Sequence, residues 1–496
     1  MKSNSMVWSL MACVLVSGSA FWSCTGSDSE LEFGVGGSSA QGGGGLGGMG
    51  GAGGVGGGDG GGGMGAAGGM NGTGGMGGME PMLPPENLPV LLIDTAGKPI
   101  FEEVKTPGLM KMIEKHDGTL MNIELQSPSF VGNIGIEVRG SSSTSFPKKS
   151  YGLELVDVNG VQVQASMLQM PEESDWILYG PYTDKTYLRD KFAYDAGRAM
   201  GRYQPLSRFV EVFVNDQYKG VYLFTEKIKR SKYRVNIAKP ALDAALGDIT
   251  GGYIFKREDT SAANGWYSAA GNPWQYHYPK HDEITPAQSA YLKKYVDDFE
   301  AMMDGPTFAD PNLGYAKWIE PLSFVDYAII QELSRNVDGY RKSAYMHKQA
   351  DSDGGKLFMG PLWDFNIAFG NADYCDGEKV NGFHYVGGAC VDQDRIPTWW
   401  PKLMSDPVFT QKLRCRWEEL RKGILKDSSM AARLDSYAPF LPLAEPRDHQ
   451  AWPVLGKYVW PNPFIGQTYS DELGYLHSWI KQRAAWLDGN MPGICP

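Results

Sequence analysis

A glycine-rich segment near the N-terminus limits how much of this chain can form a hydrophobic core. Residues 34–79 of the 496 are almost entirely glycine, with some methionine, alanine and serine. The segment has neither an apolar period nor the strict three-residue repeat of a collagen helix. We therefore predict a flexible tether, whose roughly 46 residues would span about 35–40 Å.

The residues before the tether have the layout of a secretory signal peptide, with a basic residue followed by an apolar run. Gly18-x-Ala20 suits ordinary signal peptidase, whereas "FWSC", ending at Cys24, is a degenerate lipoprotein box. We favour lipidation of Cys24. The expected boundaries are a signal peptide over 1–23 and the tether over 24–85.

Cysteine usage predicts an oxidising compartment. Of six cysteines, Cys13 leaves with the signal peptide and Cys24 would carry lipid. An even number then remains for disulfide pairing. These four are Cys375, Cys390, Cys415 and Cys495. We expect the first two to pair and the last two to pair, although four cysteines allow three connectivities.

The charge of the chain argues against a nucleic acid as partner. The formal net charge is −11, so a polyanion would be repelled. Basic residues gather only locally, in "FPKKSYGLEL" and "TEKIKRSKYRVNI". A local basic pocket on an acidic protein suits a small anion better than a duplex.

The folded part begins mostly with strands and continues mostly with helices. We expect strands at 90–95, 121–126, 134–138, 150–156 and 251–259, a helix over 184–201, and a hairpin within 207–228. We expect helices over 285–303, 321–339, 409–425 and 472–487, with a hairpin around "DSDGG" at 351–355. This order predicts an α+β fold with a cleft between a β-rich N-lobe, 86–228, and a mostly helical C-lobe, 229–496.

Two acidic residues have the spacing of a protein-kinase catalytic segment. Such a segment has a proton-accepting Asp five residues before a metal-binding Asn, and a hairpin then leads to a second, magnesium-holding Asp. Here Asp338 lies five residues before Ser343, and a hairpin leads to Asp364. Asp364 follows a mostly apolar strand, where an unpaired carboxylate is costly. A metal ion would remove that cost.

A polar loop earlier in the chain could bind phosphate. "RGSSSTSF" lies between two expected strands, and Lys148 and Lys149 open the second. Adjacent residues on a strand point to opposite faces, so only one lysine can face the cleft, and the sequence leaves open which. Lys256 in "YIFKRED" is a further candidate. At the end of the strand that finishes in "TEKI", backbone groups could bind adenine.

Several blocks together resemble the CotH (spore coat protein H) kinase-like family, over roughly residues 130–375. They are "EVRGSSSTSFPKKSYGLEL", "DWILYGPYTDKTYLRDKFAYDAGRAMG", "VFVNDQYKGVYLFTEKI", "GGYIFKRED", "NVDGYRKSAYMHK" and "PLWDFNIAFGN". The resemblance implies an atypical protein-kinase-like, two-lobed fold that binds ATP with Mg²⁺ or Mn²⁺. It also implies phosphorylation of Ser/Thr on secreted or surface proteins.

The resemblance assigns roles to particular residues. It makes Asp338 the catalytic acid and Asp364 a metal ligand, with Ser343 at the second metal position. The ATP-binding residues that it implies are Arg139, Lys148 or Lys149, Glu226 and Lys227. Two positions depart from the family pattern: Ser343 replaces an Asn, and Asn366 replaces the second Asp of "WDFD".

The sequence thus predicts an exported, lipid-anchored kinase that contacts the membrane only through its N-terminal lipid. The two departures keep an alternative open, in which the fold is a catalytically inactive surface adhesin or scaffold. Carbohydrate binding by the C-terminal tryptophans is a third possibility without specific support. No role for residues 376–496 follows from the sequence.

Overall fold

The computed structural model describes residues 87–261, 263–387, 390 and 396–496. The chain divides into two units, Met1–Met79 and Glu80–Pro496, and all described residues belong to the second. The predicted signal peptide, the tether and Cys24 lie outside the described residues, so these expectations stay predictions.

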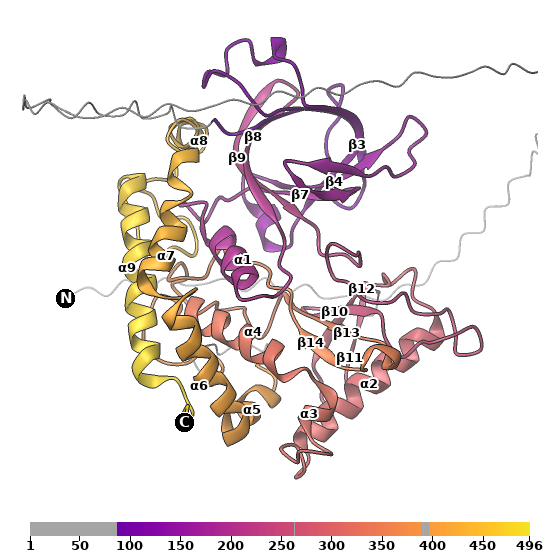
Figure 1. The fold of residues 1–496 in the computed structure, drawn as a ribbon. Helices are drawn as coiled ribbons and strands as arrows, with labels where there is room; N and C mark the ends of the chain where they lie inside the picture. Colours follow the sequence, from indigo (N-terminus) through magenta and orange to yellow (C-terminus); the bar gives the residue numbers. More distant parts are fainter. Residues whose placement is uncertain (1–86, 262, 388–389, 391–395) are drawn as a thin grey trace, which may run out of the picture. The chain divides into compact units, whose positions relative to one another are not determined.

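The first part of the described chain forms a closed barrel (Figure 1). Its strands, in spatial order, are β1 (Val90–Asp94), β2 (Thr106–Ile113), β3 (Phe130–Arg139), β4 (Ser150–Val156), β7 (Asp175–Tyr179), β9 (Gln217–Glu226) and β8 (Ser207–Val214). Neighbouring strands are antiparallel except β1 and β8, whose parallel pairing closes the barrel. A two-stranded ribbon of β5 (Ala165–Met167) and β6 (Met170–Glu173) accompanies it.

Alternation along the strands builds the barrel core. Ile134 and Ile136 of β3 are buried against Leu153 of β4 and Trp176 of β7. Such a period of two is what a sheet with one face inward requires.

A second sheet follows the barrel, with strand order β11 (Gly265–Tyr267), β12 (Pro273–Tyr278), β10 (Tyr253–Arg257), β13 (Ala344–Lys348) and β14 (Leu357–Met359). All of its pairings are antiparallel. The helices are α1 (Arg189–Ala199), α2 (Pro286–Asp304), α3 (Tyr315–Trp318), α4 (Pro321–Ser334), α5 (Trp399–Ser405), α6 (Pro407–Lys422), α7 (Asp427–Asp435), α8 (Glu445–Ala451) and α9 (Tyr469–Asn490). Short 3₁₀ turns are η1 (Ile123–Leu125), η2 (Ser142–Ser145), η3 (Asp351–Asp353) and η4 (Ala438–Phe440).

Helix α4 is the centre of the helical part. Ser323 to Ser334 of this helix are all buried, and α6 and α9 pack against it. Trp399 and Trp400 of α5 cover its Phe324. A helix that is apolar on nearly every side has to be enclosed in this way. The segment that follows α4 is therefore held from several directions.

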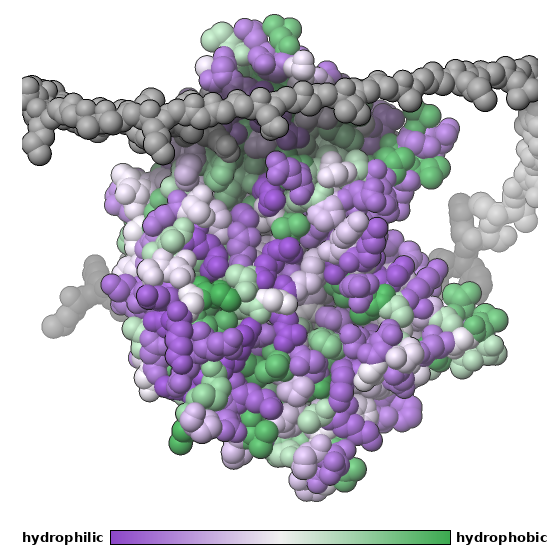
Figure 2. Space-filling view, viewed as in Figure 1, coloured by the Kyte–Doolittle hydropathy of each residue, from purple (hydrophilic) through white to green (hydrophobic). Residues whose placement is uncertain are grey.

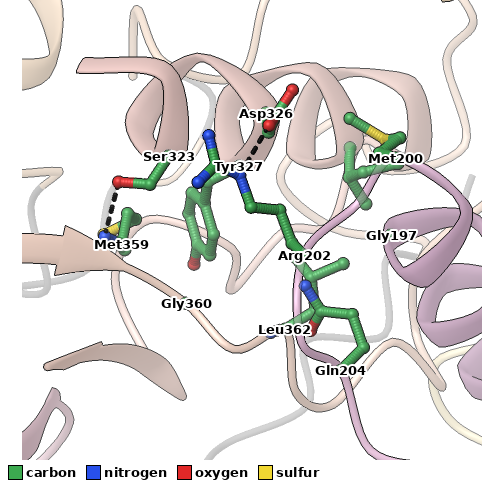
Figure 3. Close-up of a pocket in the computed structure, with 11 residues that line it drawn as sticks. Gly197, Met200, Arg202, Gln204, Ser323, Asp326, Tyr327, Met359, Gly360 and Leu362 are labelled. Carbon is green, nitrogen blue, oxygen red and sulfur yellow. Dashed lines mark hydrogen bonds and ion pairs between the residues drawn. The ribbon is translucent and has the colours of Figure 1, made fainter. Parts of the chain in front are cut away.

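Helix α1 lies beneath the barrel and contacts α4 (Figure 1). Figure 3 shows a cavity where α1, α4 and the chain after β14 meet, with room for at most one water molecule. A Cβ on Gly197 would lie 2.9 Å from Leu362 Cδ1, so glycine allows this close approach. Leu362 N–H donates to Gln204 Oε1 at 2.6 Å. These contacts fix the chain that leads to Asp364.

The structure confirms the predicted mixture of strands followed by helices and corrects several details. The strand expected at 121–126 is wrong: Asn122 has a left-handed φ of 59°, and η1 follows it. Met121 and Leu125 face solvent, so their apolar character did not indicate a core strand. Two barrel strands were missed: β2, which pairs with β1 and β3, and β7, which pairs with β4 and β9. The short strands β5, β6, β11 and β12 were also not expected. The N-terminal strands close into a barrel, and the kinase-like two-lobed fold, with lobes at 86–228 and 229–496, stays a prediction.

Two disulfides tie the C-terminal part together, in the pairing expected from the sequence. Cys375 is bonded to Cys390, and Cys415 of α6 to Cys495. Disulfides indicate an oxidising compartment. Among the described helices, none has the length and apolar character to cross a membrane. Figure 2 shows a face covered largely by hydrophilic residues, with hydrophobic ones in small groups.

Candidate active site

A pocket of about 690 Å³ lies between the barrel and the second sheet. Its size is within the usual range of small-molecule sites, about 300–1,000 Å³. We call it the carboxylate pocket, because acidic side chains from distant parts of the chain meet there. The lining residues that matter below are Arg139, Asp190, Lys256, Asp338, Asp364 and Asn366.

Asp338 is presented by a tight turn after α4. The helix ends at Ser334, its C-cap residue Arg335 has a left-handed φ of 44°, and the chain turns at Asp338. The Arg341 guanidinium donates to Asp338 Oδ1 at 3.1 Å and fixes the carboxylate. Burial raises the pKa of Asp338, although Arg341 opposes the shift. A raised pKa makes the carboxylate a better proton acceptor.

Asp364 is held through its backbone and offers its carboxylate to the pocket. Its φ of 65° lies in the left-handed region, which a non-glycine residue rarely adopts. Its N–H donates to Tyr194 Oη at 3.3 Å, and its C=O accepts from Asn336 Nδ2 at 2.9 Å. Its carboxylate accepts no hydrogen bond from the described residues. Burial, with the charges of Asp338 and Glu258, raises the pKa of Asp364 to about 6.

Asp190, in the first turn of α1, is a third acid in the same pocket. Its Oδ1 accepts from Phe365 N–H at 2.8 Å and from Tyr194 Oη at 3.0 Å. Burial and the charge of Asp364 raise the pKa of Asp190 to about 7. Three carboxylates thus line one pocket, and two of them, Asp190 and Asp364, form no ion pair with a described lysine or arginine.

Two of the cations that line the pocket, Arg139 and Lys256, come from the barrel and the second sheet. Arg139, at the end of β3, stacks over Trp363, with its guanidinium carbon 5.5 Å from the ring centroid. Its guanidinium makes no hydrogen bond or ion pair with any described residue. Lys256 of β10 lies 3.1 Å from Glu258 Oε2. Both cations oppose the rise in the pKa of Asp364.

The two departures from the family pattern have different surroundings. Ser343 lines the pocket, but its N–H and Oγ both donate to Glu258 Oε2, each at 3.2 Å. Asn366 lines the pocket two residues after Asp364. The sequence therefore places a hydroxyl and an amide where the family pattern would place an amide and a second acid.

The two lysines predicted to bind phosphate lie elsewhere. Lys148 is 2% exposed, and its Nζ donates to Asp448 Oδ1 of α8 at 2.6 Å. Lys149 Nζ donates to the carbonyl of Thr144 in the preceding loop. Both residues precede β4, and neither lines the carboxylate pocket. The cations that line the pocket are instead Arg139, which was predicted, Lys256, which was the further candidate, and Arg341 and Lys342, which were not predicted.

Glu226 and Lys227, predicted at the adenine side, do not line the pocket either. Glu226 is buried at the end of β9, where its Oε2 accepts from Leu206 N–H at 3.0 Å and Tyr203 Oη at 3.3 Å. Lys227 Nζ lies 3.6 Å from Asp175 Oδ1. The structure therefore brings together Asp338, Asp364, Ser343 and Arg139, and leaves the other predicted residues outside.

Sequence reasoning missed Asp190 and Glu258. The available signal for Asp190 was an acid on the apolar face of an amphipathic helix, in "LRDKFAYDAG". An acid in the first turn of a helix is common for electrostatic reasons alone, so the pattern did not point to the pocket. Glu258 lies in "FKRED", where a run of charges is typical of a solvated surface.

The donor set of the pocket fits a magnesium ion bound together with phosphate. No group of three or more His, Cys, Asp or Glu among the described residues is arranged to hold a metal by itself. Mg²⁺ does not need such a cage, because it is usually held by one or two carboxylates, water and substrate phosphates. The carboxylate of Asp364 and Oδ2 of Asp190, which have no hydrogen-bond partner among the described residues, are oxygen donors of that kind.

The comparison with known families now decides the assignment. The family model described as CotH kinase protein matches residues 136–487, which is well over half of the chain. The chain belongs to the CotH kinase family. The match continues through the region after residue 375, to which the sequence alone gave no role, and includes α5 to α8 and most of α9. A search of the curated proteins found no match.

Proposed function

We propose that this CotH-family protein is an exported, ATP-dependent kinase that transfers the γ-phosphoryl group to Ser or Thr hydroxyls of secreted or surface proteins. The observation that carries the proposal is the meeting of Asp338 and Asp364 in one pocket with Arg139 and Lys256. These are the charges that phosphoryl transfer needs: a proton acceptor, a metal ligand and cations for the phosphates.

Each residue has a separate task in this proposal. Asp338, oriented by Arg341, accepts the proton of the substrate hydroxyl. The hydroxyl oxygen then forms its bond to the γ-phosphorus while the bond from that phosphorus to the ADP oxygen breaks. Arg139 and Lys256 bind phosphate oxygens. Asp364 and a second oxygen donor would hold Mg²⁺ or Mn²⁺. The chemistry that a bound Mg²⁺ supplies in such enzymes is bridging of the phosphates and neutralisation of their charge.

The test measures binding and transfer separately with the full chain. Labelled ATP is added with Mg²⁺ or Mn²⁺ and dephosphorylated casein as acceptor, and the melting temperature is recorded with and without Mg²⁺-ATP. We expect label on casein or on the chain itself, and a rise in melting temperature. Asp338→Asn should keep the melting shift and lose transfer, whereas Asp364→Asn should lose both.

A matched control is Asp195→Asn, which lies on α1 but pairs with Lys191 and Tyr437 away from the pocket. This variant should transfer phosphate like the parent. A melting shift without any transfer would support the inactive scaffold instead, and the absence of both would contradict nucleotide binding. Anchoring through Cys24 and the identity of the acceptor are separate parts of the proposal, which lipid analysis and proteomics of the secreted fraction would test.

A further inference from the structure

One oxygen in the carboxylate pocket has no function in the fold itself. Asp190 is 4% exposed, and its Oδ2 is buried without a hydrogen-bond partner among the described residues. No described lysine, arginine or histidine lies within ion-pair distance of this carboxylate. A buried carboxylate oxygen without a partner is costly, because desolvation is not repaid.

A structural role of Asp190 would need only one of its two carboxylate oxygens, Oδ1. Oδ1 alone accepts from Phe365 N–H and Tyr194 Oη, and so links α1 to the residue after Asp364. An asparagine could accept both bonds without a buried negative charge. The nearby Asp184 shows the usual solution, because its carboxylate is paired with the Arg189 guanidinium. The second oxygen of Asp190 therefore needs another explanation.

The position of Asp190 relative to Asp364 supplies one. Tyr194 contacts both residues, donating to Asp190 Oδ1 and accepting from Asp364 N–H. Both acids line the same pocket, and the residue after Asp364 donates its backbone N–H to Asp190 Oδ1 at 2.8 Å. Two such carboxylates repel each other when both are ionised, and either protonation of one or a cation between them removes the repulsion.

The residue at position 366 is an asparagine, not an acid. It lines the pocket as a neutral amide, so it cannot provide the second negative charge there. We propose that Asp190 of α1 is the second protein carboxylate for the divalent cation held by Asp364, and replaces the acid that is missing at position 366. This inference rests on the proposed function, because it presupposes a cation at Asp364.

The experiment measures metal binding without any reaction. Mn²⁺ binding to the full chain is followed by the loss of the free-ion electron paramagnetic resonance signal, with Mn²⁺ alone and with a non-hydrolysable ATP analogue. We expect Asp190→Asn to weaken Mn²⁺ binding at least tenfold, the scale on which even outer partners of metal ligands act. The melting temperature without metal should stay the same or rise, because a buried charge is removed.

The controls separate this inference from the proposed function. Asp195→Asn on the same helix should bind Mn²⁺ like the parent, and the double variant Asp190→Asn with Asn366→Asp should recover most of the affinity. Failure of the parent chain itself to bind Mn²⁺ with the analogue would overturn the proposed function. Parent-like binding by Asp190→Asn would overturn only the role of Asp190. A marked fall in its metal-free melting temperature would do the same, by showing a structural need for the charge.

Discussion

Two regions of this protein bury acidic side chains, and they treat them in opposite ways. At the junction of the barrel and α8, Asp448 Oδ1 accepts from Lys148 Nζ at 2.6 Å and from Val221 N–H at 2.7 Å. Its Oδ2 accepts from Tyr187 Oη at 3.1 Å. In the carboxylate pocket, by contrast, Asp190 and Asp364 form no ion pair with any lysine or arginine in the described part of the chain.

The junction, which we call the Lys148–Asp448 cluster, is closed on every side. The Lys148 ammonium lies 5.6 and 5.3 Å from the ring centroids of Tyr187 and Tyr222. At Gly220, with a φ of 103°, a Cβ would lie 2.0 Å from Asp448 Oδ1, so only glycine fits. The comparison teaches that a lysine next to a serine-rich loop can have a packing role, whereas the acids of the pocket form no ion pair with described residues and are the better candidates for binding a ligand.

The largest expected effect concerns the paired region. Lys148→Met leaves Asp448 buried without its cation and should lower the free energy of unfolding by about 3–5 kcal/mol, the usual cost of breaking a buried pair. Denaturant titration of the chain measures this. The double variant with Asp448→Asn should recover most of the loss. If Lys148→Met kept full stability but weakened ATP binding, the roles of the two regions would be reversed.

The unpaired region should respond in the opposite direction. Asp364→Asn removes a charge that no described residue neutralises, so the metal-free protein should gain about 1–2 kcal/mol at pH 8, an amount reduced by the partial exposure of the side chain. The same denaturant titration applies. A loss of stability would mean that the carboxylate has a structural partner.

The pH dependence of stability should come from the same acids. Their pKa values in the folded protein, about 6 for Asp364 and about 7 for Asp190, lie above the ordinary value of 3.8, so the folded state binds more protons than the unfolded state. Stability should therefore fall as the pH rises from about 4 to about 7 and then level off. The charged groups that act on this pair are Asp184, Glu258, Asp338, Arg139 and Lys256.

Melting temperatures of the metal-free protein across this range provide the measurement. The variant with both Asp190→Asn and Asp364→Asn should lose this part of the slope. A slope that is unchanged in the double variant would assign the pH dependence to other groups. Added Mg²⁺ should also flatten the slope, because a bound cation favours the ionised acids.

The smallest expected effect concerns a single hydrogen bond in the Lys148–Asp448 cluster. Tyr187→Phe removes one hydrogen bond to Asp448 and should cost about 1 kcal/mol. Tyr194→Phe, its counterpart in the pocket, should change stability by a similar amount but also alter Mn²⁺ binding, since Tyr194 contacts both acids. Equal metal binding by the two variants would contradict the distinction between the regions.

Much of the fold follows from local patterns. The strands at 90–95 and 150–156, the hairpin within 207–228 and the helices around 285–303 and 321–339 were predictable, because alternation and helical spacing are strong there. The closure of the barrel was not predictable, because it depends on the parallel pairing of β1 with β8, which lie more than 100 residues apart in the sequence. Strand β2 carries "TPGLMKMI", whose proline and glycine are poor strand signals.

The site was predictable where spacing along the chain defines it. Asp338 and Asp364 come from one continuous segment, and the structure places both in the pocket. Lys148 was a candidate to face the cleft because its partner, Asp448, belongs to a helix that the sequence patterns did not predict. Asp190 was missed because it reaches the pocket only when α1 packs beside Phe365. Contacts between segments far apart in sequence are decided by tertiary packing, which no local pattern encodes.

The separation of Lys148 from Asp448 also has a consequence for the order of events during synthesis. The two residues are 300 positions apart, so a ribosome making about 5–20 residues per second adds Asp448 about 15–60 s after Lys148. Until then the lysine of the nascent barrel has no counter-charge in its apolar surroundings. The barrel is therefore expected to finish folding only after α8 has been made, and a chain that ends before α8 should be a substrate for quality-control proteases.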